Sequence, residues 1–145
     1  MKTIATLAVI LPSMAVYAQE MPLGKLVIEV PRAAVSAVKF RDAGKPKEFL
    51  TSALPAKGGN LNRLGQEMHQ IADDIYEFPT VTSPAYFAYT HERLMQELRG
   101  KAAPTKLSQV SSEVLACQAK DASQDALIAC VIAVVDGFKT TDKEN

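Results

Sequence analysis

Two cysteines, Cys117 and Cys130, set the strongest limit on the fold, because they are the only cysteines in the chain and allow a single internal disulfide. A disulfide needs Cα atoms within about 7 Å. On one continuous helix, a separation of 13 residues would place the two Cα atoms about 20 Å apart. The chain must therefore reverse between the cysteines, and residues 120–125 offer a turn. This predicts a disulfide-linked C-terminal helical hairpin; a pair of free or redox-active thiols, the alternative, lacks the C-x-x-C spacing.

The N-terminus has the three parts of a secretory signal peptide. Lys2 supplies the positive charge, Ile4 to Leu11 form the apolar run, and small residues precede a cleavage site after Ala18. The apolar run is shorter than the roughly 20 residues of a membrane span, which disfavours the alternative of an uncleaved anchor. We therefore expect residues 1–18 to be removed and residues 19–145 to form one domain, periplasmic or secreted, without membrane insertion. Disulfides persist in such oxidising compartments.

The charge of the chain is balanced overall but unevenly distributed. Without residues 1–18 the chain has 15 basic and 16 acidic residues, a formal charge of −1, which disfavours nucleic acid as a partner. Residues 25–63 carry a net charge of +5, and residues 64–97 carry −5. We interpret the two segments as packing together and neutralising each other. The alternative is two opposite surface patches that would steer a charged protein partner.

Apolar residues recur at steps of three and four through most of the chain, which predicts an all-α fold of five or six helices. We expect Asn60 to cap a helix whose polar residues, Glu67 and Asp74 among them, lie on or beside its solvated side. Leu26 to Val30 is a β-branched run that we expect to be extended. The predicted helices cover approximately residues 31–44, 46–54, 60–78, 83–99 with Ser83 as its cap, a segment from Thr105 past Cys117, and 121–138 with a capping box at Asp121 and Gln124.

The two histidines are the first candidates for chemistry. His69 precedes Asp73 by four residues, a spacing that can share a metal ion but lacks further ligands, and we interpret the two as a solvated pair. His91 lies on an apolar stripe in the sequence HERLM, without the second histidine of a zinc-protease helix. A G-x-S-x-G elbow is also missing. We predict no catalytic, cofactor-binding or metal-binding residue, and expect no enzyme. A small hydrolase or metal-dependent enzyme, the alternative, needs both histidines and several carboxylates in one cleft.

The densest aromatic group lies at the start of the predicted helix 83–99. On the helical period Phe87 belongs to the core face, whereas Tyr86 and Tyr89 fall outside it. Surface tyrosines are typical of interaction sites, so Tyr86 and Tyr89 are candidates for contact with a partner, and tight helix packing is the alternative. The apolar run from Ala126 to Val135 suggests a stress-related holdase if it is exposed.

Four turn and cap motifs follow one another along the chain: Arg41-Asp42-Ala43-Gly44-Lys45, Phe49-Leu50, Ile75-Tyr76-Glu77-Phe78-Pro79 and Thr82-Ser83-Pro84. Together they resemble a loose group of small exported helical proteins of proteobacteria whose function is unassigned. The resemblance spans about residues 33–99 and implies an architecture but no catalytic residue. In that group a cysteine commonly follows the helix that begins with Ser-Pro, whereas Tyr89 to Leu94 contain none here, so the disulfide plan differs.

Size, export, helicity and one disulfide are also similar to those of the small periplasmic immunity proteins that block secreted cell-wall amidases. From the missing catalytic motifs, the uneven distribution of charge and the candidate residues Tyr86 and Tyr89, the function that we expect is a protein-binding or inhibitory, immunity-like module. Its partner would be another protein of unknown identity, recognised by surface complementarity.

Overall fold

The computed structural model describes residues 19–120 and 123–140, and within these residues all regular structure is helical. The predicted signal peptide and Asp121 lie outside the described residues. The described part of the chain contains six α-helices, which confirms the predicted fold class. They are α1 (Leu23–Asp42), α2 (Lys47–Thr51), α3 (Arg63–Glu77), α4 (Ser83–Leu98), α5 (Ser111–Ala119) and α6 (Gln124–Asp136), with a short 3₁₀ helix, η2 (Leu107–Gln109), before α5.

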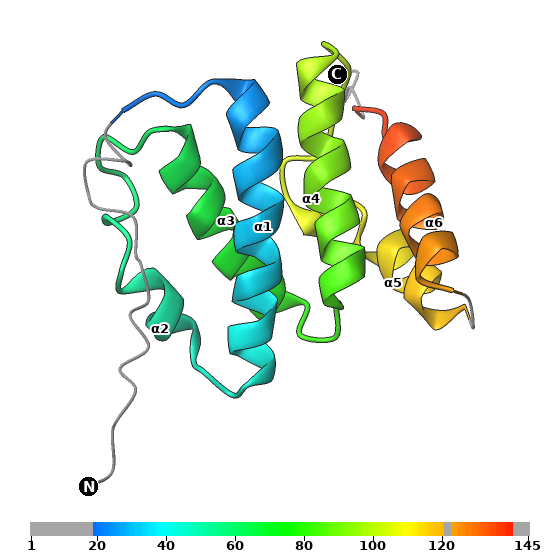
Figure 1. The fold of residues 1–145 in the computed structure, drawn as a ribbon, viewed down its shortest axis with the longest axis horizontal. Coiled ribbons are helices and arrows are strands. Elements are labelled where there is room, and N and C mark those ends of the chain that lie inside the picture. The colour runs from blue at the N-terminus through cyan, green and yellow to red at the C-terminus, as the bar shows by residue number, and fades with distance from the viewer. Residues whose placement is uncertain (1–18, 121–122, 141–145) are drawn as a thin grey trace, which may run out of the picture.

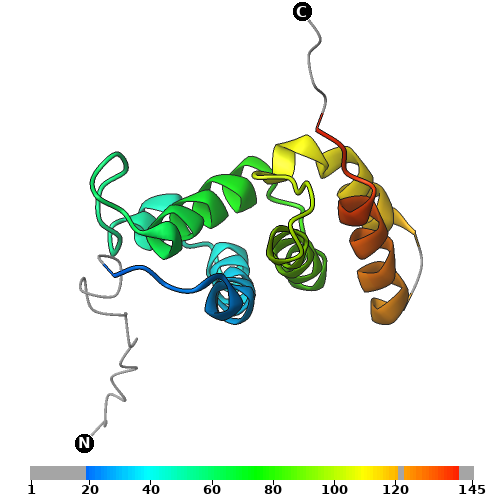
Figure 2. The ribbon, with the colours of Figure 1, turned by 90° about the horizontal axis from the view of Figure 1, so that it is seen from above.

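The helices form two layers. In the front layer α4 lies between α1 and α6, and α1 and α4 run antiparallel (Figure 1). Seen from above, α2, α3 and α5 form the second layer behind them (Figure 2). The central helix α4 therefore contacts neighbours on both flanks and behind, and only its front side is left uncovered.

The prediction of an extended segment at Leu26 to Val30 is wrong, because α1 begins at Leu23 and continues through Pro31. Leu26, Val30 and Ala34 are all buried in the core. Their spacing of four residues is the helical period, and packing against the rest of the molecule outweighs the β propensity of this run. The N-terminal part of the predicted domain therefore forms a helix of the front layer.

Three predicted helix starts are displaced by one or two residues. The cap of α3 is Asn62 rather than Asn60, and its Oδ1 accepts a hydrogen bond from the backbone N–H of Gly65 at 2.9 Å. Thr82, not Ser83, is the N-cap of α4. The cap of α6 is Ser123, whose Oγ accepts from Ala126 N–H at 3.2 Å. Such shifts are common, because neighbouring polar residues compete for the same orphan amides.

The predicted helix from Thr105 past Cys117 is divided in two. The 3₁₀ helix η2 comes first, and α5 begins only at Ser111. After α5 the chain reverses into α6, and Cys117 and Cys130 form a disulfide with a Cα–Cα distance of 5.8 Å. The predicted disulfide-linked helical hairpin is confirmed.

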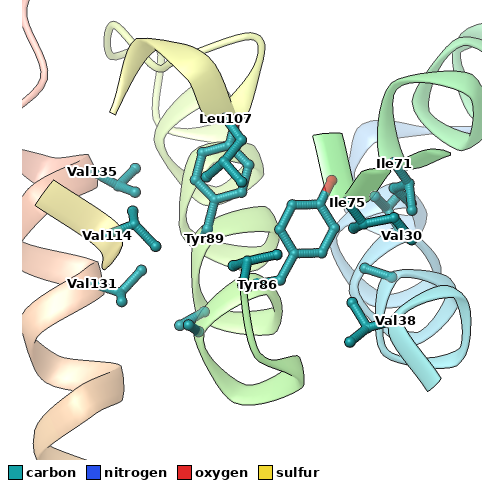
Figure 3. Packing of buried hydrophobic residues seen from close by; sticks show 14 of the residues in the cluster. Val30, Val38, Ile71, Ile75, Tyr86, Tyr89, Leu107, Val114, Val131 and Val135 are labelled. Atoms are coloured by element: carbon teal, nitrogen blue, oxygen red, sulfur yellow. The ribbon is translucent and has the colours of Figure 1, made fainter. Parts of the chain in front are cut away.

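One apolar cluster connects the two layers. Figure 3 shows Tyr86 and Tyr89 of α4 in its middle, with Val131 of α6 on one side and Ile71 of α3 on the other. Leu107 of η2 belongs to the same buried cluster. The core is therefore organised around the aromatic residues at the start of α4.

Candidate functional site

The two oppositely charged segments meet in the structure. Lys47 and Lys57 of the basic segment both form ion pairs with Asp73 of α3. Arg63 binds both carboxylate oxygens of Glu97, at 2.8 and 2.7 Å. These contacts are those that mutual neutralisation predicts, so the charge split does not by itself provide a steering surface.

The prediction that Tyr86 and Tyr89 lie at the surface is wrong, since both side chains are 0% exposed. Phe87, which was expected in the core, is 37% exposed. The hydroxyl of Tyr86 donates to Asp74 Oδ2 at 3.0 Å, which anchors the ring between α3 and α4. Each residue turns an α-helix by about 100°, so a small error in the assigned face exchanges neighbouring residues. Tyr86 and Tyr89 are core residues that hold α4 in place.

Glu67 and Arg93 form a buried ion pair between α3 and α4. Their side chains are 6% and 3% exposed, and the guanidinium of Arg93 donates to both carboxylate oxygens of Glu67. Arg63 Nε donates to Glu67 Oε1 at 2.8 Å from the solvent side. Burial alone raises the pKa of the Glu67 carboxyl, but the hydrogen bonds and charges of Arg93 and then Arg63 outweigh burial and hold this pKa below its ordinary value. Glu67 is therefore ionised and fixed in place.

Asp74 is the second buried carboxyl of α3. Besides the Tyr86 hydroxyl it accepts hydrogen bonds from Gln70 Nε2 at 2.9 Å and from the backbone N–H of Leu107 at 3.1 Å. Burial raises the pKa of Asp74 above its ordinary value, and these three donors oppose the rise. The carboxyl therefore ties α3 to α4 and to η2.

Glu67 and Asp74 were expected on or beside the solvated side of α3, and this expectation is wrong. Both residues follow the apolar period, because Leu64, Glu67, Ile71 and Asp74 are spaced by three, four and three residues. Acidic residues at core positions of a helical stripe are the signal from which this network could have been found. Arg93, the basic partner of Glu67, lies 26 residues further along the chain, and no comparable local sequence pattern indicates this pairing.

The two tyrosine hydroxyls provide a matched test of this network. Replacing Tyr86 with phenylalanine removes a donor to the buried Asp74, and we expect a loss of about 1–3 kcal/mol in the free energy of unfolding. Tyr89→Phe is the control, because its buried hydroxyl has no hydrogen-bond partner among the described residues. Its stability should stay within about 0.5 kcal/mol of the parent or rise. Urea unfolding measures both, and equal losses in the two variants would contradict this account.

The two histidines have different surroundings. His69 is buried, and its Nε2 donates a hydrogen bond to the carbonyl oxygen of Pro55 at 2.6 Å. Its expected partner Asp73 is instead bound by lysines, which corrects the interpretation of a solvated pair. The ring of His91 stacks on Phe87 with centroids 6.0 Å apart. Residues 19–120 and 123–140 contain no group of three His, Cys, Asp or Glu side chains that could hold a metal ion.

A second pair of carboxylates lies between α4 and α6. The side-chain amide of Gln96 donates to Glu92 Oε1 at 3.1 Å and also to Asp136 Oδ1. Arg99 Nη1 donates to Glu92 Oε1 at 3.0 Å. Burial, and then the hydrogen bond and charge of Asp136, raise the pKa of Glu92 above its ordinary value, although Arg99 and Gln96 oppose the rise.

This pair gives the docking of α6 a pH dependence. A carboxyl whose pKa is higher in the folded than in the unfolded state destabilises the fold when it is ionised. This destabilisation decreases as the pH falls through the folded-state pKa toward the unfolded-state pKa. We expect Glu92→Gln, which imitates the protonated form, to be more stable relative to the parent at neutral pH than near pH 4. Asp136→Asn should show the same trend. Urea unfolding across this pH range checks both, and an advantage that grows toward low pH would contradict the assignment.

A polar cleft of about 390 Å³ opens between α3, α4 and the loop of residues 101–105. Cavities of this size are within the range of small-molecule sites. The lining of the cleft includes three cations, two carboxylates and two amides: Arg63, Arg93, Lys101, Glu67, Glu97, Gln66 and Gln70. We call this site the polar cleft.

The outer surface of α1 and α4, which we call the front face, consists of Ile28 and Val35 of α1 and of Phe87, His91, Met95 and Leu98 of α4. Tyr86 and Arg93 of α4 bind α3, and Phe87 and Leu98 lie about 100–140° away from them around the helix. Ile28, Phe87 and Leu98 are 51%, 37% and 49% exposed. Among the described residues only one other large apolar side chain, Phe49 of α2, is as exposed.

Neither a family model, nor a curated protein, nor a solved structure is detectably similar to the chain. Across the described ranges, no helix combines the length and the apolar character needed to cross a membrane.

Proposed function

We propose that the protein is an exported, protein-binding module of the inhibitory, immunity-like kind, and that its front face binds the partner. The observation that carries this proposal is that three of the four exposed large apolar side chains among the described residues, Ile28, Phe87 and Leu98, belong to the two helices α1 and α4, which pack against each other. Exposed apolar side chains grouped on a regular helical surface are typical of protein interfaces, in which aromatic residues and methionine are enriched. The interaction site is therefore assigned to Phe87 and its neighbours in place of Tyr86 and Tyr89.

The front face has the composition of an interface rather than of a ligand pocket. Its centre on α4 is apolar and aromatic, with Phe87 stacked on His91. Charged residues of α1, such as Arg32 and Lys39, are exposed beside it and can form a polar rim. A rigid helical surface with an aromatic anchor binds a partner with little loss of conformational entropy.

Periplasmic or secreted localisation is part of the proposal. It is supported by the signal-like residues 1–18 and by the Cys117–Cys130 disulfide, a bond typical of oxidising compartments. Mass spectrometry of the protein recovered from its host tests this part. An N-terminus at Gln19 is expected, and a protein that retains Met1 and is found with the cytoplasmic fraction would contradict it.

The binding role is tested by affinity capture from the cell envelope with two matched variants. Phe87→Ser combined with Leu98→Ser alters the front face, and Phe49→Ser alters an exposed phenylalanine of α2. We expect a specific partner to be recovered with the parent and with Phe49→Ser, and its recovery to fall at least about tenfold with the front-face variant, the effect of about 1.4 kcal/mol. Circular dichroism controls for folding. Equal recovery with all three proteins would overturn the proposal.

A further inference from the structure

We infer that the polar cleft is a binding site for a small polar molecule that carries a carboxylate, such as the C-terminus of a short peptide. The cleft is built from α3, α4 and residues 101–105. It uses none of the front-face residues, so this inference goes beyond the proposed function and stands or falls independently of it.

The charges of the cleft leave one cation uncompensated. Arg93 is paired with Glu67, and Arg63 is paired with Glu97 and also reaches Glu67. Lys101, which lines the same cleft, makes no ion pair or hydrogen bond through its side chain with the described residues. The cleft therefore has a net charge of +1 and attracts an anion.

Arg63 is placed to recognise a carboxylate in particular. Its guanidinium already binds the carboxylate of Glu97 through two parallel hydrogen bonds, the geometry that suits this group. Both side chains are partly open to solvent, 34% for Arg63 and 39% for Glu97, so this pair can exchange for an incoming anion. Behind it the buried Glu67–Arg93 pair fixes the position of Arg63 Nε.

The burial of the Glu67–Arg93 pair supports a functional reading of the cleft. Apolar residues of similar volume often give equal or greater stability than a buried ion pair, so stability alone does not explain this pair. The side chains of Gln66 and Gln70 supply amide groups beside the charges, whereas Ala103 and Pro104 supply a small apolar wall. Such a lining suits a ligand with a charged end and a short neutral body.

The test uses a pair of probes that differ only in the carboxylate. The isotope-labelled, oxidised protein is titrated with N-acetyl-alanyl-alanine and with its C-terminal amide, and amide shifts are followed by NMR. We expect the acid to shift residues 63–70 and 101–105 and to saturate at concentrations at least about tenfold lower than the amide. Acetate is a second probe: binding as tight as that of the peptide would mean that any small carboxylate suffices, and weaker binding would show that the neutral body of the ligand also contributes.

Lys101→Gln removes the unpaired cation, and Lys25→Gln on α1 is the matched control at another exposed lysine. The first variant should lose the preference for the acid over the amide, and the second should keep it. Equal affinity of the parent for acid and amide would overturn the inference. A parent that shows no saturable shift in the cleft, or an unchanged preference in Lys101→Gln, would do the same.

Discussion

Replacing Glu67 with alanine is expected to lower the free energy of unfolding by about 3–5 kcal/mol, because it leaves Arg93 buried without a counter-charge. Arg93 is 3% exposed and sits against the ring of Tyr89, with its guanidinium 5.7 Å from the ring centroid. Urea unfolding followed by circular dichroism measures the loss.

Two further variants separate burial from charge pairing. Glu97→Ala removes the half-exposed carboxylate from Arg63 and should cost only about 0–1 kcal/mol. The double variant Glu67→Leu with Arg93→Met removes both buried charges and should recover much of the single-variant loss. A double variant less stable than Glu67→Ala would show that the pair contributes net stability, which this account does not expect.

Removing the disulfide is expected to have the second largest effect, a loss of about 3 kcal/mol for a ring of this length. Of the residues in α6 only Val131 and Val135 are fully buried, and Leu127, Ile128 and Val134 pack against the core while they stay partly exposed. We expect the variant Cys117→Ala with Cys130→Ala to lose protection of α6 in hydrogen exchange before α1, α3 and α4 unfold.

Reduction of the parent protein provides the control for this prediction. The reduced parent should show the same loss of stability as the double alanine variant, because both lack the cross-link. A variant within about 0.5 kcal/mol of the oxidised parent would mean that packing alone holds the hairpin.

The helical fold was predictable from the sequence because periodicity is a local signal. The same reasoning identified the hairpin, since two cysteines leave a single pairing and the geometry of a straight helix forbids it. The helical state of Leu26 to Val30 was not predicted, because it depends on packing against distant parts of the chain. The first residues of some helices were also not predicted, because two polar residues that are close in sequence, such as Asn60 and Asn62, can each serve as the cap.

The candidate sites were less predictable, because they depend on contacts between separate helices. The buried Tyr86 donates a hydrogen bond to Asp74, which is 12 residues away, and no local sequence pattern predicts this partner. The polar cleft combines residues of α3 with Lys101, which follows α4. Only the acidic residues on the apolar stripe of α3 gave a usable local signal.

The central claim, that the front face binds another protein, is tested most directly by site-specific crosslinking in the intact cell envelope. A photoreactive residue is placed at Leu98 on the front face or at Phe49 on α2, two positions of similar exposure, 49% and 43%. The account predicts a discrete covalent adduct with one protein from position 98 and none from position 49. No adduct from position 98, or the same adduct from both positions, would contradict it.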